Sequence, residues 1–213
     1  MNNKENFSLF TEKIINEIKV SEKKPSLLLH VCCAPCSSYV LEYLSTYFDI
    51  TVYFYNPNID TETEFRYRAD EEKRFISEMG LSNTVRYTEG EYDNAEFLKI
   101  ARGLENAPEG SERCVKCFNL RLEKSAIRAK EGGFDYFTTT LSISPLKNSN
   151  LLNMIGKSLS EKYDVKYLYS DFKKKNGYKR SVELSRKYNL YRQSYCGCAF
   201  SKNQAIREGR AEK

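Results

Sequence analysis

Long apolar runs and tryptophan are both missing from this chain of 213 residues. No uninterrupted apolar stretch approaches the roughly 20 residues that a membrane-spanning helix needs. The first thirty residues also lack the basic start, the apolar stretch and the small-residue cleavage site of a secretory signal. These absences argue against a helical membrane protein and a secreted one, so we expect a cytoplasmic protein without a membrane partner.

Internal repeats, low-complexity tracts and a recognisable linker are absent as well. A chain of this length can bury a hydrophobic core without covalent cross-links, so the seven cysteines are not needed to hold it together. In a reducing compartment, clustered thiols bind metal or carry out redox chemistry more often than they form structural disulfides. We expect a single α/β catalytic domain over residues 25–213, preceded by a helical extension over residues 1–24.

Acidic residues are scarce in the second half of the chain. Residues 1–110 contain 12 lysines and arginines against 19 aspartates and glutamates, whereas residues 111–213 contain 22 against 10. The densest basic stretch runs from Lys173 to Tyr195 and holds eight cations, one carboxylate and four tyrosines. Cations that neutralise phosphates, together with rings that stack on bases, suit an RNA partner. A solvated helix face explains the charge alone equally well.

Strand-like and helix-like patterns alternate along the chain. Short apolar runs predict five strands, at residues 27–31, 50–58, 84–89, 134–141 and 165–171. Amphipathic patterns predict helices before Pro25 and at residues 37–48, 61–80, 93–103, 114–133 and 150–163. This alternation indicates a doubly wound, mainly parallel sheet with helices on both faces. In such folds the ligand site lies at the carboxyl ends of the strands.

The cysteines fall into three groups that read CCAPC, CVKC and CGC. Their seven thiols belong to Cys32, Cys33, Cys36, Cys114, Cys117, Cys196 and Cys198. A helix that starts after CCAPC would favour thiolates there, because its free amides and dipole face the sulfurs. The spacing of three in CVKC puts both sulfurs on one face of a helix. Gly197 lets the CGC backbone turn tightly around a ligand.

Several kinds of site fit parts of this pattern. A thioredoxin-like oxidoreductase would use Cys33 and Cys36 in a CxPC turn and leave five cysteines unexplained. A structural zinc site in an RNA-binding module would take four thiolates, for instance from CVKC and CGC, and leave CCAPC over. An iron–sulfur cluster also takes four cysteines, and the other three could hold a second metal with an open position. Only this last arrangement uses all seven cysteines as ligands.

Five stretches together resemble the QueH family of epoxyqueuosine reductases: HVCCAPC, YNPNI, ERCVKCFNLRL, FTTTLSISPLKN and YCGCAFS. The resemblance runs from about Leu27 to Ser201 and implies a Rossmann-like fold akin to adenine-nucleotide hydrolases. It also implies an oxidoreductase of tRNA processing that reduces epoxyqueuosine to queuosine at the wobble position of GUN-type anticodons. An adenylating tRNA sulfurtransferase would share the fold, but the SGGxDS pyrophosphate loop of those enzymes is missing here.

The resemblance further implies a 4Fe-4S cluster beside a mononuclear iron, with all seven cysteines as ligands. The cluster is expected on Cys33, Cys114, Cys117 and Cys196, and the iron on Cys32, Cys36 and Cys198. Either CGC cysteine fits either centre. Adjacent residues of an extended segment point to different sides, so Cys32 and Cys33 can serve two neighbouring centres. Members of the family often carry aspartate where Cys36 stands, so the iron would here gain a softer ligand.

The implied reaction takes two electrons and two protons, whereas a cluster passes single electrons. An external one-electron donor of the ferredoxin or flavodoxin type is therefore expected, with Cys32 and Cys36 as catalytic residues. Either His30, the only histidine, or Tyr195 could donate a proton, although packing fits both. Strand-end candidates for substrate contacts are Asn56, Asn58, Ser142, Ser144 and Asn148. Candidate tRNA contacts are Arg113, Lys147, Lys174, Lys175, Arg180 and Arg192.

Overall fold

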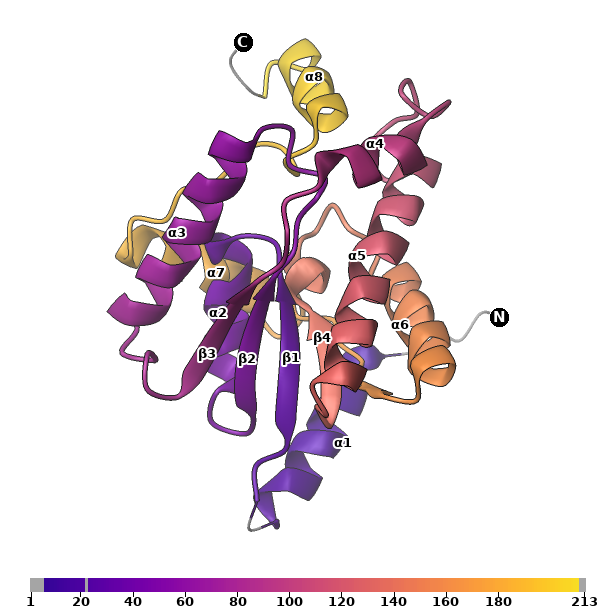
Figure 1. Cartoon of the computed structure of the whole chain (residues 1–213). Helices are drawn as coiled ribbons and strands as arrows, with labels where there is room; N and C mark the ends of the chain where they lie inside the picture. The colour runs from indigo at the N-terminus through magenta and orange to yellow at the C-terminus, as the bar shows by residue number, and fades with distance from the viewer. Residues whose placement is uncertain (1–5, 22, 211–213) are drawn as a thin grey trace.

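A five-stranded parallel sheet forms the centre of the computed structural model, which describes residues 6–21 and 23–210 (Figure 1). Its strands are β1 (Ser26–Val31), β2 (Asp49–Phe54), β3 (Val85–Glu89), β4 (Tyr136–Thr139) and β5 (Lys166–Tyr167). In space they run in the order β3-β2-β1-β4-β5, and every pairing is parallel. The chain therefore adds strands to one side of β1 and then, from β4 onward, to the other.

Helices cover both faces of this sheet. They are α1 (Phe7–Lys19), α2 (Ala34–Leu44), α3 (Glu62–Glu78), α4 (Asn94–Ala101), α5 (Glu112–Glu131), α6 (Ser149–Tyr163), α7 (Gly177–Lys187) and α8 (Ala199–Arg207). In Figure 1, α3 lies to the left of the sheet with α2 and α7 behind the strands, while α5 and α6 lie on the right. The doubly wound α/β fold expected from the alternating patterns is confirmed, and the strand order is consistent with the Rossmann-like description.

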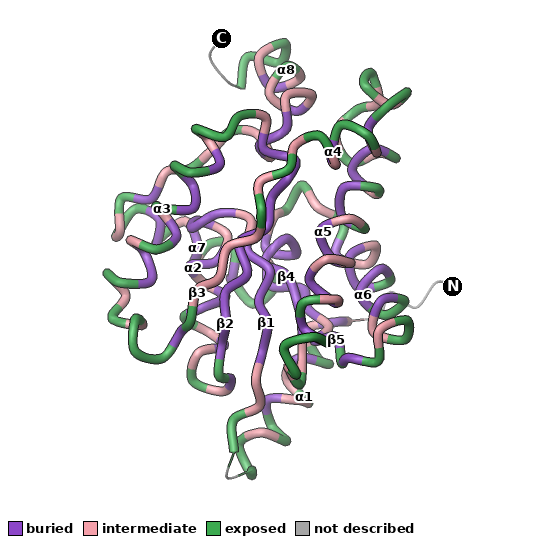
Figure 2. The backbone as a smooth tube through the Cα atoms, in the orientation of Figure 1, coloured by how far each residue is buried: buried purple, intermediate pink, exposed green. Residues whose placement is uncertain are grey.

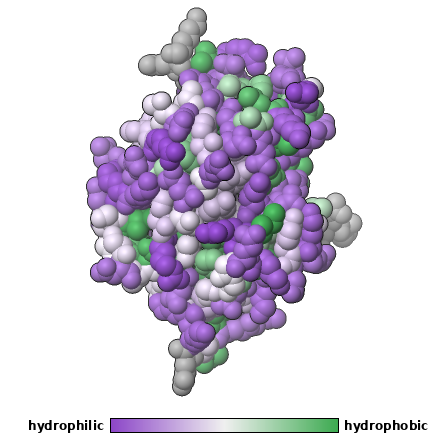
Figure 3. All heavy atoms as spheres, viewed as in Figure 1, coloured by the Kyte–Doolittle hydropathy of each residue, from purple (hydrophilic) through white to green (hydrophobic). Residues whose placement is uncertain are grey.

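The central strand β1 is buried on both sides, as its continuous apolar run predicts (Figure 2). Leu27 and Leu29 belong to the hydrophobic core beneath α2 and α3, whereas Leu28 belongs to the core beneath α5 and α6. This alternation follows from the two-residue period of a strand. The face of the molecule seen in Figure 3 is mostly hydrophilic, with small separate hydrophobic patches.

Several expected elements differ from the observed ones at their ends. The strand expected over residues 165–171 is observed only as β5 (Lys166–Tyr167). The strand expected to reach residue 58 ends at Phe54, before the turn at Asn56. Beyond β4 the chain enters the short 3-10 helix η1 (Thr140–Ile143) instead of extending the strand. The helix expected from residue 37 begins at Ala34, because Pro35 suits its first turn and the Cys33 carbonyl accepts from the amides of Cys36 and Ser37. Helix α8 was not expected, whereas α7 agrees with the helix-face interpretation of the basic stretch.

The N-terminal helix α1, expected from its spacing, packs against the side of the fold beyond β5. Ile15 joins the core beneath α2, and the Thr11 hydroxyl donates a 2.6 Å hydrogen bond to the Tyr169 carbonyl. The Phe7 ring stacks on the Tyr169 ring, with centroids 6.0 Å apart. Among the described helices, none is long and apolar enough to cross a membrane.

Candidate functional site

A cavity of about 280 Å³ opens at the carboxyl ends of β1 and β4, where the strand order reverses. Three segments far apart in the sequence build its wall. CCAPC follows β1, residues 144–147 follow η1, and residues 192–196 lead into α8. The cavity therefore lies where a doubly wound sheet is expected to have its ligand site.

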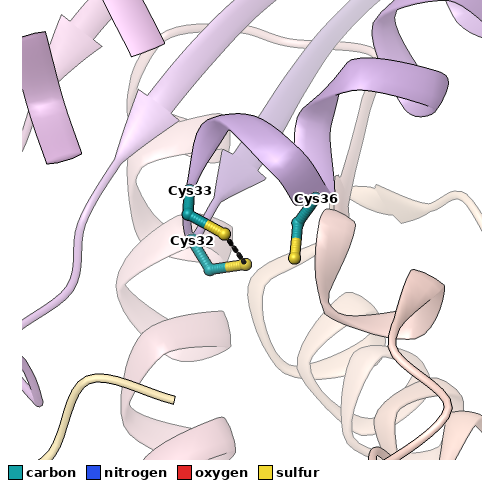
Figure 4. Close-up of side chains that lie close together, drawn as sticks. All are labelled: Cys32, Cys33 and Cys36. Atoms are coloured by element: carbon teal, nitrogen blue, oxygen red, sulfur yellow. Dashed lines mark hydrogen bonds between the residues drawn. The ribbon is translucent and has the colours of Figure 1, made fainter. Parts of the chain in front are cut away.

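The three CCAPC thiols point into one space (Figure 4). The Sγ atoms of Cys32 and Cys33 lie 3.9 Å apart, and all three Sγ atoms lie within 4.8 Å of one another. Cys33 is extended (φ −176°, ψ 159°) and caps α2, so Cys36 comes back toward it within the first helical turn. The expectation that Cys32 and Cys33 face different sides is wrong, because the strand ends at Val31 and regular alternation ends with it.

The three CCAPC thiols shift one another's pKa. Hydrogen bonds from Cys33 and Cys36 hold the pKa of Cys32 well below its usual range. The bond to Cys32 raises the pKa of Cys36 to about 12, and it also raises the pKa of Cys33. The group therefore holds one negative charge more easily than two or three. A bound metal cation would displace the remaining protons, since thiolates and not thiols are metal ligands.

The other four thiols line a smaller cavity that adjoins the first. They belong to Cys114, Cys117, Cys196 and Cys198. Helix α5 presents the first two, and the amide of Gly110 donates to the sulfur of Cys114 at 3.2 Å. The sulfurs of Cys196 and Cys198 are 3.6 Å apart. Cys196 lines both cavities, so the two sets of thiols meet at this residue.

The CGC turn is held by the loop that follows β2. The amide of Asp60 donates to the Gly197 carbonyl at 3.1 Å, and the Asn58 side chain donates to the Cys196 carbonyl at 3.4 Å. Gly197 has a φ of 113°, a conformation that strongly favours glycine. A Cβ atom there would also lie 3.1 Å from the Arg68 guanidinium. Glycine is thus required both by the backbone and by the close approach of Arg68.

Two cations, the buried Arg121 and the partly buried Lys147, lie beside the thiols. Arg121 is 2% exposed and donates to the Asn56 side-chain oxygen, and it lines both cavities together with Lys147. Burial lowers the pKa of Lys147, but the neighbouring Cys32 and Cys196 thiolates outweigh it and raise the value. Within the described part of the chain, neither cation forms an ion pair with a carboxylate.

His30 lies inside the sheet and does not line either cavity. Its Nδ1 atom is 2.8 Å from the Thr139 hydroxyl, and its Nε2 atom is 3.1 Å from the Tyr55 carbonyl. Burial and the charge of Arg121 lower the pKa of His30 to about 3, so the ring is neutral. These contacts favour a packing role for His30 over proton donation.

Tyr195 does line the larger cavity, and its ring is half-buried beneath the Arg68 guanidinium at 5.5 Å. Ser144 lines the cavity as well. Asn148 instead caps α6 by accepting from the Leu151 amide. The Ser142 hydroxyl is buried against Ser170. Tyr195 and Ser144 therefore remain candidates for substrate contacts.

The candidate RNA contacts separate into two groups. Lys147 and Arg192 line the larger cavity. Lys175 pairs with Glu12, and Arg180 forms a two-pronged ion pair with Glu42. Lys174 contacts Asn6, and Arg113 donates to three backbone carbonyls of the loop before α5. Only the first group lines the larger cavity, while Arg113 lines the smaller one.

Sequence reasoning missed Arg68, Glu109 and Arg121, all of which line the larger cavity. Arg121 follows Cys117 by four residues, and this spacing places both on one face of α5. This spacing could have identified Arg121 as a site residue from the sequence. Arg68 lay in a helix rich in charge, where no local pattern distinguishes a buried arginine from an exposed one.

Comparison with known proteins gives concordant matches. The family model described as epoxyqueuosine reductase QueH matches residues 27–204. The protein of that name from Streptococcus pyogenes is 47% identical over 202 residues, which cover 94% of this chain and 79% of the relative. The one from Staphylococcus epidermidis is 44% identical over 212 residues, with 98% and 88% coverage. The one from Thermotoga maritima is 38% identical over 182 residues, with 83% and 90% coverage. The chain belongs to the epoxyqueuosine reductase QueH family.

Proposed function

We propose that this protein reduces epoxyqueuosine to queuosine in tRNA. The observation that carries the proposal is the pair of adjoining thiol sets at the strand-order reversal, which meet at Cys196 beside an open cavity. Family membership supports the same activity. The epoxide loses both carbon–oxygen bonds and becomes an alkene. Two electrons and two protons are consumed, and the oxygen leaves as water.

The thiol sets fit a 4Fe-4S cluster and a separate iron. Four thiols line the smaller cavity, and four thiolates are the usual ligand set of such a cluster. The three CCAPC thiols lie close enough together to hold one metal ion. This grouping supports placing Cys33 with Cys32 and Cys36, and both CGC cysteines with the cluster. It thus exchanges Cys33 and Cys198 relative to the partition expected from the sequence.

The charges around the thiols fit anionic metal centres. Arg121 and Lys147 line both cavities, and no described carboxylate pairs with either. Buried charges in proteins are paired or coordinate metals. Thiolates that hold iron would supply the missing negative charge. When bound, the cluster supplies single electrons and the iron supplies Lewis acidity toward the epoxide oxygen.

The chain's own residues position the substrate. A cavity of about 280 Å³ suits one modified nucleoside and not a folded stem. The wobble nucleotide would therefore enter alone, splayed out of the anticodon loop. The Tyr195 side chain at the wall, held beneath Arg68, helps to shape the cavity, and Arg192 and Lys147 offer charge to the neighbouring phosphates. A ferredoxin- or flavodoxin-type protein would supply the electrons one at a time.

The activity is tested with tRNA whose GUN anticodon carries epoxyqueuosine. The protein is purified without oxygen and incubated with this tRNA and a chemical reductant. The nucleosides are then separated by chromatography and identified by mass spectrometry. We expect epoxyqueuosine to be replaced by queuosine, with the loss of one oxygen atom. Persistence of the epoxide in the presence of iron-loaded protein would overturn the proposal.

A further inference from the structure

Arg121 sits between the two sets of thiols. It lies on α5, seven residues after Cys114 and four after Cys117, so all three side chains share one face of the helix. Its side chain lines both cavities, although the residue is only 2% exposed. A guanidinium is always charged at physiological pH. A permanent positive charge is therefore enclosed beside the four thiols of the smaller cavity.

The side chain that holds Arg121 is neutral. The Asn56 Oδ1 atom accepts from an Nη atom of Arg121, and the Asn56 Nδ2 atom donates to the Val31 carbonyl at 2.9 Å. The second bond orients the amide, so that its oxygen faces Arg121. The Nε atom of Arg121 is buried without a hydrogen-bond partner in the described part of the chain. This arrangement fixes the position of the guanidinium but does not neutralise its charge.

Arg68 provides an internal comparison. It is also 2% exposed and also lines the larger cavity. Its Nε atom, however, donates to the Glu64 carboxylate at 2.8 Å, so its charge is balanced within the protein. Arg121 has no such carboxylate among the described residues, and its charge acts on the thiols instead. Burial raises the pKa of Cys117 to about 11, and the charge of Arg121 works in the opposite direction.

We propose that Arg121 is a positioning residue that raises the reduction potential of the cluster held by the four thiols of the smaller cavity. An added electron makes the cluster more negative, and a fixed cation beside it favours that reduced state. Asn56 holds the guanidinium in place while leaving its charge available. This inference rests on the proposed function, because it assumes the cluster. It assigns to Arg121 the task of making the cluster reducible by a biological donor.

The test is the midpoint potential of the cluster in Arg121→Gln, measured by a redox titration followed in the visible spectrum. We expect a shift to more negative potential, with the iron and sulfide content of the wild type retained. Arg128→Gln is the matched control, since Arg128 lies on the same helix but is exposed. It should leave the potential unchanged. An unchanged potential in a fully loaded Arg121→Gln protein overturns the inference.

Two further variants cover the case in which Arg121→Gln does not retain the cluster. Asn56→Asp keeps the guanidinium but places a carboxylate against it, so the potential should again become more negative; an unchanged potential overturns the inference. If Asn56→Asp also loses the cluster, the deciding variant is Arg121→Lys, which keeps the positive charge. A cluster retained in Arg121→Lys supports the role of this charge, and a cluster lost in Arg121→Lys overturns the inference. Failure of the proposed function would look different, because the fully loaded wild type would then leave the epoxide intact.

Discussion

Cys36 belongs to only one of the two sets of thiols. It lines the larger cavity and not the smaller one, and its sulfur lies within 4.8 Å of those of Cys32 and Cys33. Cys36→Ala should therefore keep the visible absorbance of the cluster. It should lower turnover by about 100-fold or more, since losing even an outer partner of a metal ligand costs 10- to 100-fold. Spectra and turnover of the same preparation measure both.

Cys36→Asp is the control for this change, because it restores an anionic ligand at the same place. It should recover part of the activity that Cys36→Ala loses. Wild-type turnover in Cys36→Ala would remove Cys36 from the mechanism.

Glu72 gives a pH dependence to the stability of the fold. Its carboxyl is fully buried and accepts a 2.8 Å hydrogen bond from Ser37, the residue after Cys36. Burial raises the pKa of Glu72 from 4.5 to about 8. Between these values the unfolded chain is ionised while the folded chain keeps its proton. The free energy of unfolding therefore falls as pH rises through this window, by about 1.4 kcal/mol per pH unit from this group.

Glu72→Gln should remove that contribution. Melting temperatures of the wild type and the variant, measured from pH 5.5 to 8, should diverge steadily in favour of the variant as pH rises. Parallel curves would show that Glu72 keeps an ordinary pKa.

At the scale of elements, the CGC turn depends on contacts that only the fold provides. Gly197→Ala would force a strained backbone and push a Cβ atom to 3.1 Å from the Arg68 guanidinium. We expect this variant to lose cluster content, because the turn carries two of its four proposed ligands. Gly209→Ala is the matched control: Gly209 also has a positive φ, of 68°, but a Cβ there meets nothing within 4 Å. Equal iron and sulfide content in both variants would contradict the expectation.

The segment between α7 and α8 carries the proposed contact with RNA. Arg192 lines the larger cavity, whereas Lys174 lies away from it and contacts Asn6. Arg192→Gln should weaken tRNA binding and reduce the slope of log affinity against log salt by about 0.7, the value for one phosphate contact on a single strand. Lys174→Gln should leave that slope nearly unchanged. Binding titrations at several salt concentrations measure both, and equal slopes for the two variants would count against this assignment.

Elements with a strong local signal were predictable from the sequence. The run LLLHV is apolar except for His30 because β1 is buried on both faces, and CVKC lies on one face of α5 because its spacing is helical. Helix α8 escaped prediction because only Ser201 and Ala205 of its side chains are buried, so its hydrophobic pattern is weak. Local signals thus predicted the elements whose burial is periodic, left α7 as one of two interpretations of the basic stretch, and missed α8.

At the scale of the whole molecule, the switch between β1 and β4 brings the three cysteine groups together. Alternating patterns were enough to predict that a site would lie at the carboxyl ends of the strands. They were not enough to predict which thiols adjoin one another. That grouping depends on contacts such as the one from Asn58 to the Cys196 carbonyl, which joins residues 138 positions apart. No local spacing encodes a contact of this kind.

If the seven thiols hold two separate metal centres, iron and sulfide determination after anaerobic purification will find both. We predict about five irons and four sulfides per chain, from one four-iron cluster and one additional iron. A colourless protein that holds zinc, or no metal and no sulfide, would show that the thiols hold neither centre.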